Sequence, residues 1–255
     1  MTKDYLLSKM TWQEVESALN ETDIVVVPIG STEQHGPALP LDNDAYIATE
    51  LATRIAERLW DIKKIVVAPT ISFGFSPHHM EFKGTITLSE ATLANMIVDI
   101  CRSLVNHGFR KIILINGHGG NSSAIDNALH RMNGDTEAKI FNIEWWRFAA
   151  DIISEVASRP LFHACDMETS LAWYLSQRVI DEKRVDEPGR IPIPGFFEAD
   201  MLSPPPKVST SFMMKEITDS GVVGYSTRAT KEKGKIVADA ILERLEEFIF
   251  RISEL

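Results

Sequence analysis

Residues 30–44 read Gly-Ser-Thr-Glu-Gln-His-Gly-Pro-Ala-Leu-Pro-Leu-Asp-Asn-Asp and directly follow an apolar run, Ile-Val-Val-Val-Pro-Ile, at 24–29. The run predicts a buried strand, and the loop after it carries three side chains of metal-ligand type, Glu33, His35 and Asp44. Carboxylate and imidazole groups together suit zinc, manganese or iron. Because Glu33 and His35 are two residues apart, an extended stretch points them the same way. The loop therefore predicts a metal site at a strand end, the alternative being an ordinary polar loop.

Around this loop the chain alternates strand and helix patterns. Further strands are predicted at 65–68, 112–115 and 140–143. Pro28 indicates that the first strand either lies at a sheet edge or is close to its own end there. Helices are predicted from Asp44, after the candidate N-cap Ser89, over 169–176 and over 231–250. Strands separated by helices imply an α/β fold, a three-layer α/β/α sandwich with a mostly parallel sheet.

Composition limits the class of protein. The 255 residues, 44% of them hydrophobic, predict a single domain over 1–255 with ample core. A net charge of -10 argues against nucleic acid or an anionic membrane as partner. No apolar run reaches the length of a membrane span and no signal-peptide pattern is present, so we expect a cytoplasmic protein. Cys101 and Cys165 imply no disulfide framework.

Periodicity is lost between residues 188 and 215, where prolines recur, including three in succession at 204–206. A long irregular segment within a compact domain is usually a functional lid, an arm between subunits, or disordered. We predict that 188–215 is a lid or an oligomer contact.

A second group of polar residues, Asn-Gly-His-Gly-Gly-Asn at 116–121, follows the strand predicted at 112–115. His118 therefore projects from a carboxyl strand end, as Glu33 and His35 do. In open parallel sheets these ends border one crevice, so the two loops can converge. The glycines let a ligand approach the backbone closely. The alternatives are plain structural glycines and a phosphate-cradling turn, but the pattern matches neither the dinucleotide fingerprint nor the Walker loop, which argues against phosphate binding.

A third group, His-Ala-Cys-Asp-Met-Glu-Thr-Ser at 163–170, opens a helical pattern. Glu168 lies where the helix dipole alone would favour a carboxylate. His163 and Asp166 could likewise form a surface pair. The argument for a site is joint, because three turns bearing ligand-type residues occur at strand-to-helix junctions of one chain.

The three groups resemble the creatininase (creatinine amidohydrolase) family. Its members carry Gly-Ser-x-Glu-Gln-His-Gly-Pro-x-Leu-Pro-Leu-x-x-Asp, a strand ending in Asn-Gly-His-Gly-Gly-Asn, and a later His-Ala-Gly-x-x-Glu-Thr-Ser. Weaker similarities occur at 75–88 and 221–224, and the resemblance covers most of 24–235. It implies a creatininase-like fold and a hydrolase with two divalent metal ions, each zinc, manganese or iron.

Carried over by position, the resemblance implies that Glu33 and His118 hold one metal ion, His35 and Glu168 hold the other, and Asp44 bridges them. Two such cations can share a water and make it a hydroxide near neutral pH, which then attacks a polarised carbonyl.

The resemblance also places His163 beside the substrate, as proton donor to the leaving nitrogen or as a clamp on the developing oxyanion. Further candidate substrate contacts are the backbone amides of Gly119 and Gly120, the loop residues His78 and His79, and Trp145. A tryptophan could stack on a planar ring, although tryptophans more often pack in cores and interfaces.

Departures from creatininase itself bear on the substrate. There the Gly-His is followed by Tyr-Glu, whose glutamate is a further ligand, whereas this chain has Gly119 and Gly120. Arg159 stands where creatininase has a tryptophan shortly before the substrate histidine, and Cys165 where the family usually has glycine. Creatinine is therefore not the preferred substrate.

These observations predict a metal-dependent amidohydrolase that cleaves C–N bonds other than peptide bonds, in a small cyclic amide, formamide or peptide-like molecule. One alternative is a ring-opening hydrolase of a cyclic ketone or diketone, acting on a C–C bond in carbohydrate or inositol catabolism. Another is a non-catalytic metal-binding protein, which would not need His163. The expected partners are a small-molecule substrate and, as the resemblance suggests, further copies of the same chain in a homo-oligomer, often a hexamer.

Overall fold

The computed structural model describes residues 5–203 and 207–255. In this part of the chain, four parallel strands form one sheet in the order β2-β1-β3-β4. The strands are β1 (Ile24–Ile29), β2 (Val66–Val67), β3 (Lys111–Asn116) and β4 (Lys139–Glu144). Each lies where an apolar run predicted a strand. The prolines at 204–206, part of the predicted irregular segment, lie outside the described residues.

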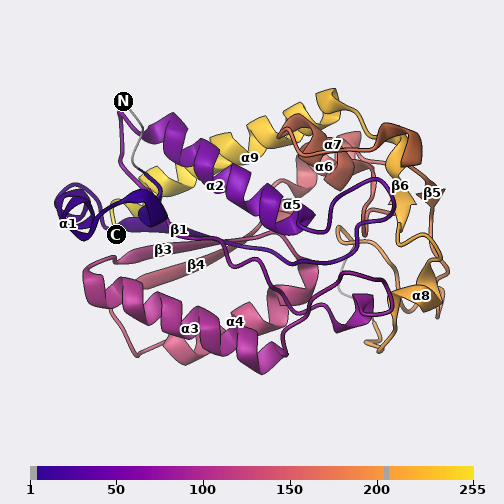
Figure 1. The fold of residues 1–255 in the computed structure, drawn as a ribbon, viewed down its shortest axis with the longest axis horizontal. Helices are drawn as coiled ribbons and strands as arrows, with labels where there is room; N and C mark the ends of the chain where they lie inside the picture. Colours follow the sequence, from indigo (N-terminus) through magenta and orange to yellow (C-terminus); the bar gives the residue numbers. More distant parts are fainter. Residues whose placement is uncertain (1–4, 204–206) are drawn as a thin grey trace.

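Helices cover both faces of this sheet (Figure 1). One face carries α2 (Asn43–Leu59), α7 (Asp166–Tyr174) and α9 (Lys231–Ile252), and the other α3 (Glu90–His107) and α4 (Ser122–Met132). Alternate residues of β1 enter the two cores, Ile24 and Val26 on the side of α2 and α9, Val25 and Val27 on the side of α3 and α4. A strand buried on both faces requires this alternation. The predicted three-layer α/β/α fold is confirmed.

Pro28 does not mark a sheet edge, because β1 lies between β2 and β3. It marks the end of the strand instead, being the second-last residue of β1. Its carbonyl faces the side of β2 and accepts from the backbone N–H of Ile71 at 3.0 Å. Since β2 has already ended at Val67, the missing proline N–H removes no bond between strands.

Local signals set the helix ends. The predicted cap Ser89 accepts from the N–H of Thr92 at 3.1 Å, as an N-cap should. Helix α7 begins at Asp166, three residues before the predicted start. The prediction placed the start too late because the polar first turn of this helix lacks apolar periodicity. α9 packs closely on α7 through Gly234, where a Cβ atom would come within 2.0 Å of the Ser170 carbonyl oxygen.

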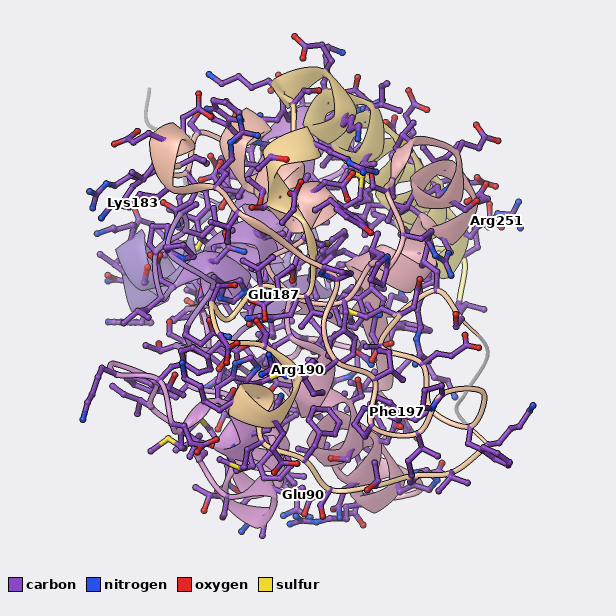
Figure 2. The ribbon with its side chains drawn as sticks, turned by 90° about the vertical axis from the view of Figure 1, so that its right-hand side faces the viewer. Glu90, Lys183, Glu187, Arg190, Phe197 and Arg251 are labelled. Atoms are coloured by element: carbon purple, nitrogen blue, oxygen red, sulfur yellow. The ribbon has the colours of Figure 1, made fainter. Side chains whose placement is uncertain are left out.

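The shorter elements carry no signal in the sequence. These are α1 (Trp12–Leu19), α5 (Trp145–Phe148), α6 (Ala150–Val156), β5 (Asp186–Glu187), α8 (Met214–Ile217) and β6 (Gly224–Tyr225). The antiparallel pair β5–β6 and α8 lie at the carboxyl ends of the main strands, at the right of Figure 1. Figure 2 looks onto this end and shows Glu187 and Arg190 near its middle.

The described residues between Pro188 and Met213 form no helix or strand, as the loss of periodicity predicted. Their role as lid or oligomer contact stays a prediction. In the part of the chain that the structure describes, no helix combines the length and apolarity needed to cross a bilayer.

Candidate functional site

The predicted ligands meet at the carboxyl ends of the parallel strands. Glu33 and His35 lie in the loop after β1, Asp44 in the first turn of α2, His118 directly after β3, and Glu168 in the first turn of α7. All five are buried, with Glu33 fully so and Glu168 7% exposed. Burying three carboxylates together is unfavourable unless positive charge accompanies them.

The loops are held together by close backbone contacts. A Cβ atom at Gly117 would come within 2.3 Å of the Asp44 carbonyl oxygen, so only glycine lets the end of β3 approach the start of α2. The Asn121 amide donates to the Gly30 carbonyl at 3.0 Å and accepts from the Phe75 N–H at 2.9 Å. One side chain therefore joins three loops.

The third turn differs from its prediction in one respect. His163 follows no strand of the main sheet, but forms an isolated antiparallel bridge with Val223. The two residues exchange backbone hydrogen bonds of 2.8 and 3.2 Å. The weaker family similarity at 221–224 thus corresponds to a segment that positions His163.

The ligand-type atoms gather into overlapping groups. His118 Nδ1 lies 3.2 Å from both Glu33 Oε1 and Asp44 Oδ2. His35 Nε2 lies 2.9 Å from Asp44 Oδ1 and 4.0 Å from Glu168 Oε1. Asp44 therefore belongs to both groups, with one oxygen facing each histidine, which is the arrangement a bridging carboxylate needs. The assignment of these residues to two metal ions stays a prediction.

Hydrogen bonds on the far side of each ring indicate which nitrogen faces the site. His35 Nδ1 lies 3.2 Å from the Glu33 carbonyl oxygen, and His118 Nε2 lies 3.2 Å from the Phe75 carbonyl oxygen. A carbonyl only accepts, so these nitrogens carry the protons. In the neutral rings that bind a metal ion, the opposite nitrogens, His35 Nε2 and His118 Nδ1, then present lone pairs to the site.

Several inward-facing atoms lack hydrogen bonds. Among the described residues, the buried side-chain atoms without a hydrogen-bond partner include Glu33 Oε1, His35 Nε2, Asp44 Oδ2 and Glu168 Oε2. Buried polar atoms are normally satisfied, and these converge on one space. Their oxygen and imidazole chemistry fits zinc, manganese or iron. The residues therefore fit a metal centre.

The charges of the group point the same way. Burial disfavours an imidazolium at His35, yet the Asp44 carboxylate raises the pKa of His35 to about 10. Against burial, Glu33 likewise raises the pKa of His118 well above its ordinary value. Burial raises the pKa of Glu168 to about 7. The carboxylates thus attract positive charge. Protons supply this charge when no metal ion is bound, and a cation supplies it when one binds.

A cavity of about 110 Å³ opens beside these residues. The predicted substrate contacts His78, His79, Gly119 and Gly120 all line it, as does His163. Its remaining wall includes three apolar side chains, Phe162, Met201 and Met214. Among the described residues that line it there is no lysine or arginine.

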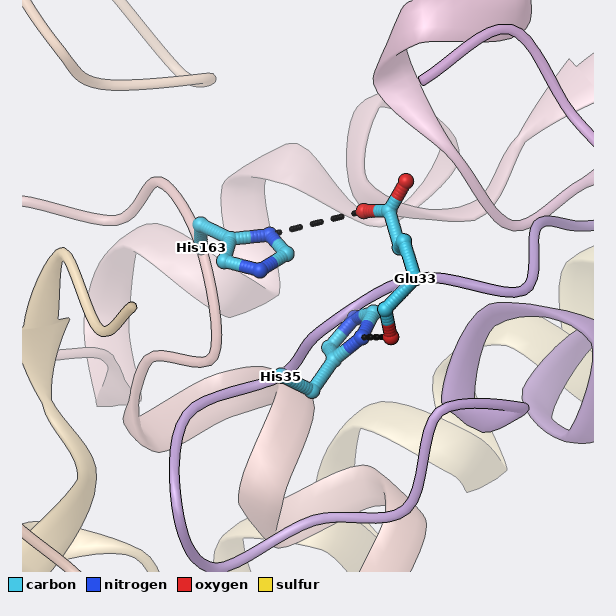
Figure 3. A group of neighbouring side chains, drawn as sticks. All are labelled: Glu33, His35 and His163. Atoms are coloured by element: carbon cyan, nitrogen blue, oxygen red, sulfur yellow. Dashed lines mark hydrogen bonds and ion pairs between the residues drawn. The ribbon is translucent and has the colours of Figure 1, made fainter. Parts of the chain in front are cut away.

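His163 faces the site with one nitrogen (Figure 3). Nε2 lies 2.8 Å from the Gln34 carbonyl oxygen and donates to it, while Nδ1 faces Glu33 Oε1 at 3.8 Å. Burial, with the charge on His35, lowers the pKa of His163 to about 3. A neutral His163 therefore presents a lone pair at Nδ1. It can accept a proton first and donate one only afterwards.

The prediction that Trp145 contacts substrate is wrong in this structure. Its side chain is 2% exposed and packs in the core, edge-on to Trp146 with ring centroids 5.8 Å apart. It is absent from the described residues that line the cavity. Cys165 is fully buried, and burial raises the pKa of its thiol well above the ordinary value, which agrees with a packing role.

Two other residues of the site were not predicted from the sequence. Ser76 Oγ donates to Glu33 Oε2 at 2.5 Å and lies 3.1 Å from His118 Nε2, so it contacts two predicted ligands. Gln34 contacts His79 through its side chain and His163 through its carbonyl. The only sequence signal for Gln34 was its place between two ligands.

Comparison with known proteins gives a consistent result. The family model Creatininase, described as creatinine amidohydrolase, matches residues 8–249. A 3-dehydro-scyllo-inosose hydrolase from Thermotoga maritima is 30% identical over 261 residues, covering 96% of this chain and 82% of that protein. A creatinine amidohydrolase from Pseudomonas putida is 27% identical over 270 residues, covering 98% and 97%. A mycofactocin precursor peptide peptidase from Mycobacterium tuberculosis is 31% identical over 225 residues, covering 86% and 81%.

Solved structures agree. A crystal structure of creatinine amidohydrolase superposes with a TM-score of 0.79 at 26% identity, covering 98% of both chains. A manganese form of creatininase has a TM-score of 0.77 at 24% identity, covering 96% of this chain and 97% of that one. A creatininase mutant of the Zn-Zn type has a TM-score of 0.76 at 24% identity, covering 96% of each chain. The last two show the shared fold.

Proposed function

This chain belongs to the creatininase family and is a hydrolase, and from that premise we propose that it is a metal-dependent amidohydrolase with two divalent ions. Its substrate would be a small cyclic amide, formamide or peptide-like molecule. One observation carries the proposal: four buried ligand atoms without hydrogen-bond partners converge from the loop after β1 and from the first turns of α2 and α7, beside a cavity. Such atoms are unfavourable in an empty site and useful around a cation.

In the proposed centre, Glu33 and His118 would hold one ion, and His35 and Glu168 would hold the other. Asp44 would contribute to holding both ions. Bound there, the ions would supply Lewis acidity that lowers the pKa of a water and polarises the substrate carbonyl. Relatives solved with manganese and with zinc support these metals for this chain too.

His163 is proposed as the group that moves the proton. Its Nδ1 lone pair faces the site, because Nε2 is already bonded to the Gln34 carbonyl. It would accept a proton from the attacking water and pass it to the leaving nitrogen. Proton transfer of this kind needs a group within hydrogen-bond reach of both atoms, and a residue on the cavity wall meets that need.

The cavity limits the substrate. It is small, one wall is apolar, and no described lysine or arginine lines it to pair with a phosphate or carboxylate. We therefore propose a compact, uncharged carbonyl compound with an apolar part facing Met201 and Met214. Substrates of relatives are diverse by name, including creatinine, a precursor peptide and an inosose, so the relatives do not select one.

A second candidate keeps the same centre but opens the ring of a cyclic ketone at a C–C bond. The 30% identity to a 3-dehydro-scyllo-inosose hydrolase over 96% of this chain favours it. Both candidates need an attacked carbonyl, and they differ in whether nitrogen or carbon leaves. The non-catalytic alternative is disfavoured, because the chain belongs to a family of hydrolases.

Metal analysis with a matched pair of variants tests the proposal. We expect about two zinc, manganese or iron ions per wild-type chain, loss in Asp44→Asn, and no loss in Asp61→Asn, which makes the same change at an exposed position. About one ion would indicate a mononuclear hydrolase. Absence of metal after reconstitution would overturn the proposal.

Substrate class is then decided with the loaded protein and a panel of cyclic amides, formamides, short peptides and cyclic diketones. Turnover that needs metal and is lost in Asp44→Asn identifies the class. The predicted homo-oligomer is tested separately by sedimentation, where a monomer at micromolar concentration would contradict it.

A further inference from the structure

The Gln34 side chain is fixed in one orientation. Its Oε1 accepts from the backbone N–H of Gly36 at 2.9 Å, and its Nε2 donates to the Gly221 carbonyl at 3.1 Å. An N–H can only donate and a carbonyl can only accept, so the two contacts independently assign oxygen and nitrogen of the amide. The amide group cannot be turned over without breaking both.

The space around this amide is also fixed. Gly221 has a φ angle of +91°, and a Cβ atom there would lie 1.9 Å from Gln34 Oε1. Glycine is therefore needed for the amide to reach its place. The segment at 221–224, which also pairs with His163, thus holds two parts of the site.

The fixed amide determines the proton position on His79. Gln34 Nε2 lies 2.9 Å from His79 Nδ1, and the amide nitrogen can only donate. His79 Nδ1 must then accept with its lone pair. In the neutral ring the proton consequently lies on the other nitrogen, Nε2.

That N–H faces the site. His79 Nε2 lies 3.4 Å from Glu33 Oε1, the unpartnered oxygen, and the His79 ring lies 4.4 Å from the His163 ring. His79 also lines the cavity. Neighbouring rings therefore present opposite groups, a lone pair at His163 Nδ1 and an N–H at His79 Nε2.

We propose that His79 is a catalytic residue that donates a hydrogen bond to the substrate oxygen as it becomes negative, and that Gln34 is the positioning residue that fixes its tautomer. This rests on the proposed hydrolysis. Water oxygen bonds to the carbonyl carbon, and the C=O π pair moves onto the oxygen, which His79 stabilises without giving up its proton. The water proton passes through His163 to the nitrogen, which leaves as the C–N bond breaks and the pair returns to the oxygen.

The tautomer is tested by ¹⁵N NMR of histidine-labelled full-length protein, loaded with zinc. We expect wild-type His79 to be protonated at Nε2 alone. In Gln34→Glu a carboxylate faces Nδ1, and we expect Nδ1 to carry the proton in place of Nε2. Gln13→Glu adds the same charge at an exposed position and should leave the His79 signals unchanged. Protonation of Nδ1 in the wild-type protein would overturn the inference.

The catalytic role is tested with acetohydroxamate, a small ligand that binds metal ions through an anionic oxygen. On zinc-loaded protein we expect about tenfold weaker binding in Gln34→Glu and His79→Leu, because a hydrogen bond to a charged oxygen is lost. His79→Gln keeps an N–H donor and should recover part of the affinity, while Gln13→Glu should match wild type.

Zinc content separates the other readings. Equal zinc in all variants with weakened ligand binding supports the proposal. Zinc lost in His79→Leu would mean that His79 only orients Glu33, and unchanged ligand affinity would also overturn the proposal. A wild-type protein that binds no zinc overturns the proposed function itself, while the NMR result still decides whether Gln34 fixes the tautomer.

Discussion

Ser76 shows how much of the site depends on residues that bind nothing themselves. Its hydroxyl donates to one oxygen of Glu33 and lies within hydrogen-bond distance of His118 Nε2 and of the Ser31 hydroxyl. It therefore leaves Glu33 Oε1 and His118 Nδ1, 3.2 Å apart, free to face the same space. Groups that orient ligands in this way commonly change metal affinity 10- to 100-fold.

We accordingly expect Ser76→Ala to weaken zinc binding about 10- to 100-fold, while the free energy of unfolding without metal falls by only about 1 kcal/mol. Competition with a chelator measures the first quantity and urea denaturation the second. Ser103→Ala removes an exposed serine hydroxyl and should change neither by much. Equal zinc affinity in the two variants would contradict the role of Ser76.

Ligands were predictable from sequence where their residue type and spacing identified them. Glu33, His35 and Asp44 are recognisable in one short loop. The roles of Ser76 and Gln34 could not be predicted, because their contacts are made across the fold. Ser76 lies 43 residues from Glu33 along the chain, and Gln34 lies 45 residues from His79. Trp145 shows the reverse error, since its type suggested ring stacking and only its burial assigns it to the core.

At the scale of elements, length decided what could be predicted. α9 spans 22 residues and α3 spans 18, so several turns of apolar periodicity indicated each. β5 and β6 have two residues each and carry no periodicity at all. Contacts made across the chain hold them, among them those of Asp186 with Thr227 and those of Glu187 with residues 219–220.

Glu187 connects β5 to residues 219–220. Its carboxylate accepts from the N–H groups of Asp219 and Ser220 at 2.8 and 3.0 Å and from the Ser220 hydroxyl at 2.5 Å. Partial burial works to raise its pKa, but the hydrogen bonds from Ser220 and Thr218 outweigh burial and lower the pKa of Glu187 to about 2. Because this folded pKa lies below the unfolded value, the charged form stabilises the fold.

The stabilisation is therefore complete above the unfolded pKa near 4.5 and is lost as the pH falls towards 2. We expect Glu187→Gln to lower the free energy of unfolding by about 1 to 2 kcal/mol at pH 6, allowing for solvent screening. The reduction should become progressively smaller between about pH 4.5 and 2. Urea unfolding across this range gives the difference. Glu182→Gln, an exposed change nearby, is the control. A wild-type-minus-variant difference that does not depend on pH would contradict the argument.

At the scale of the molecule, the fold brings negative charge into its interior. Glu33, Asp44 and Glu168 are buried residues, and their carboxylates lie in one cluster. The unfolded chain keeps the same groups in water, far apart. A cation that binds the cluster but binds the unfolded chain weakly must therefore stabilise the folded state by mass action.

For free zinc at about 1,000 times its Kd, that stabilisation is about 4 kcal/mol per site, which raises the Tm of a chain of this size by roughly 10 °C. Calorimetry with stepwise zinc should show the Tm climbing with concentration and returning on addition of a chelator. Magnesium should have little effect, because it prefers an octahedral shell of oxygens and the cluster offers imidazoles. In Asp44→Asn the zinc-dependent rise should largely disappear, since Asp44 belongs to two of the three groups of ligand-type residues. If the Tm of the wild-type protein did not change with zinc, protons alone would balance the negative charge of the clustered carboxylates.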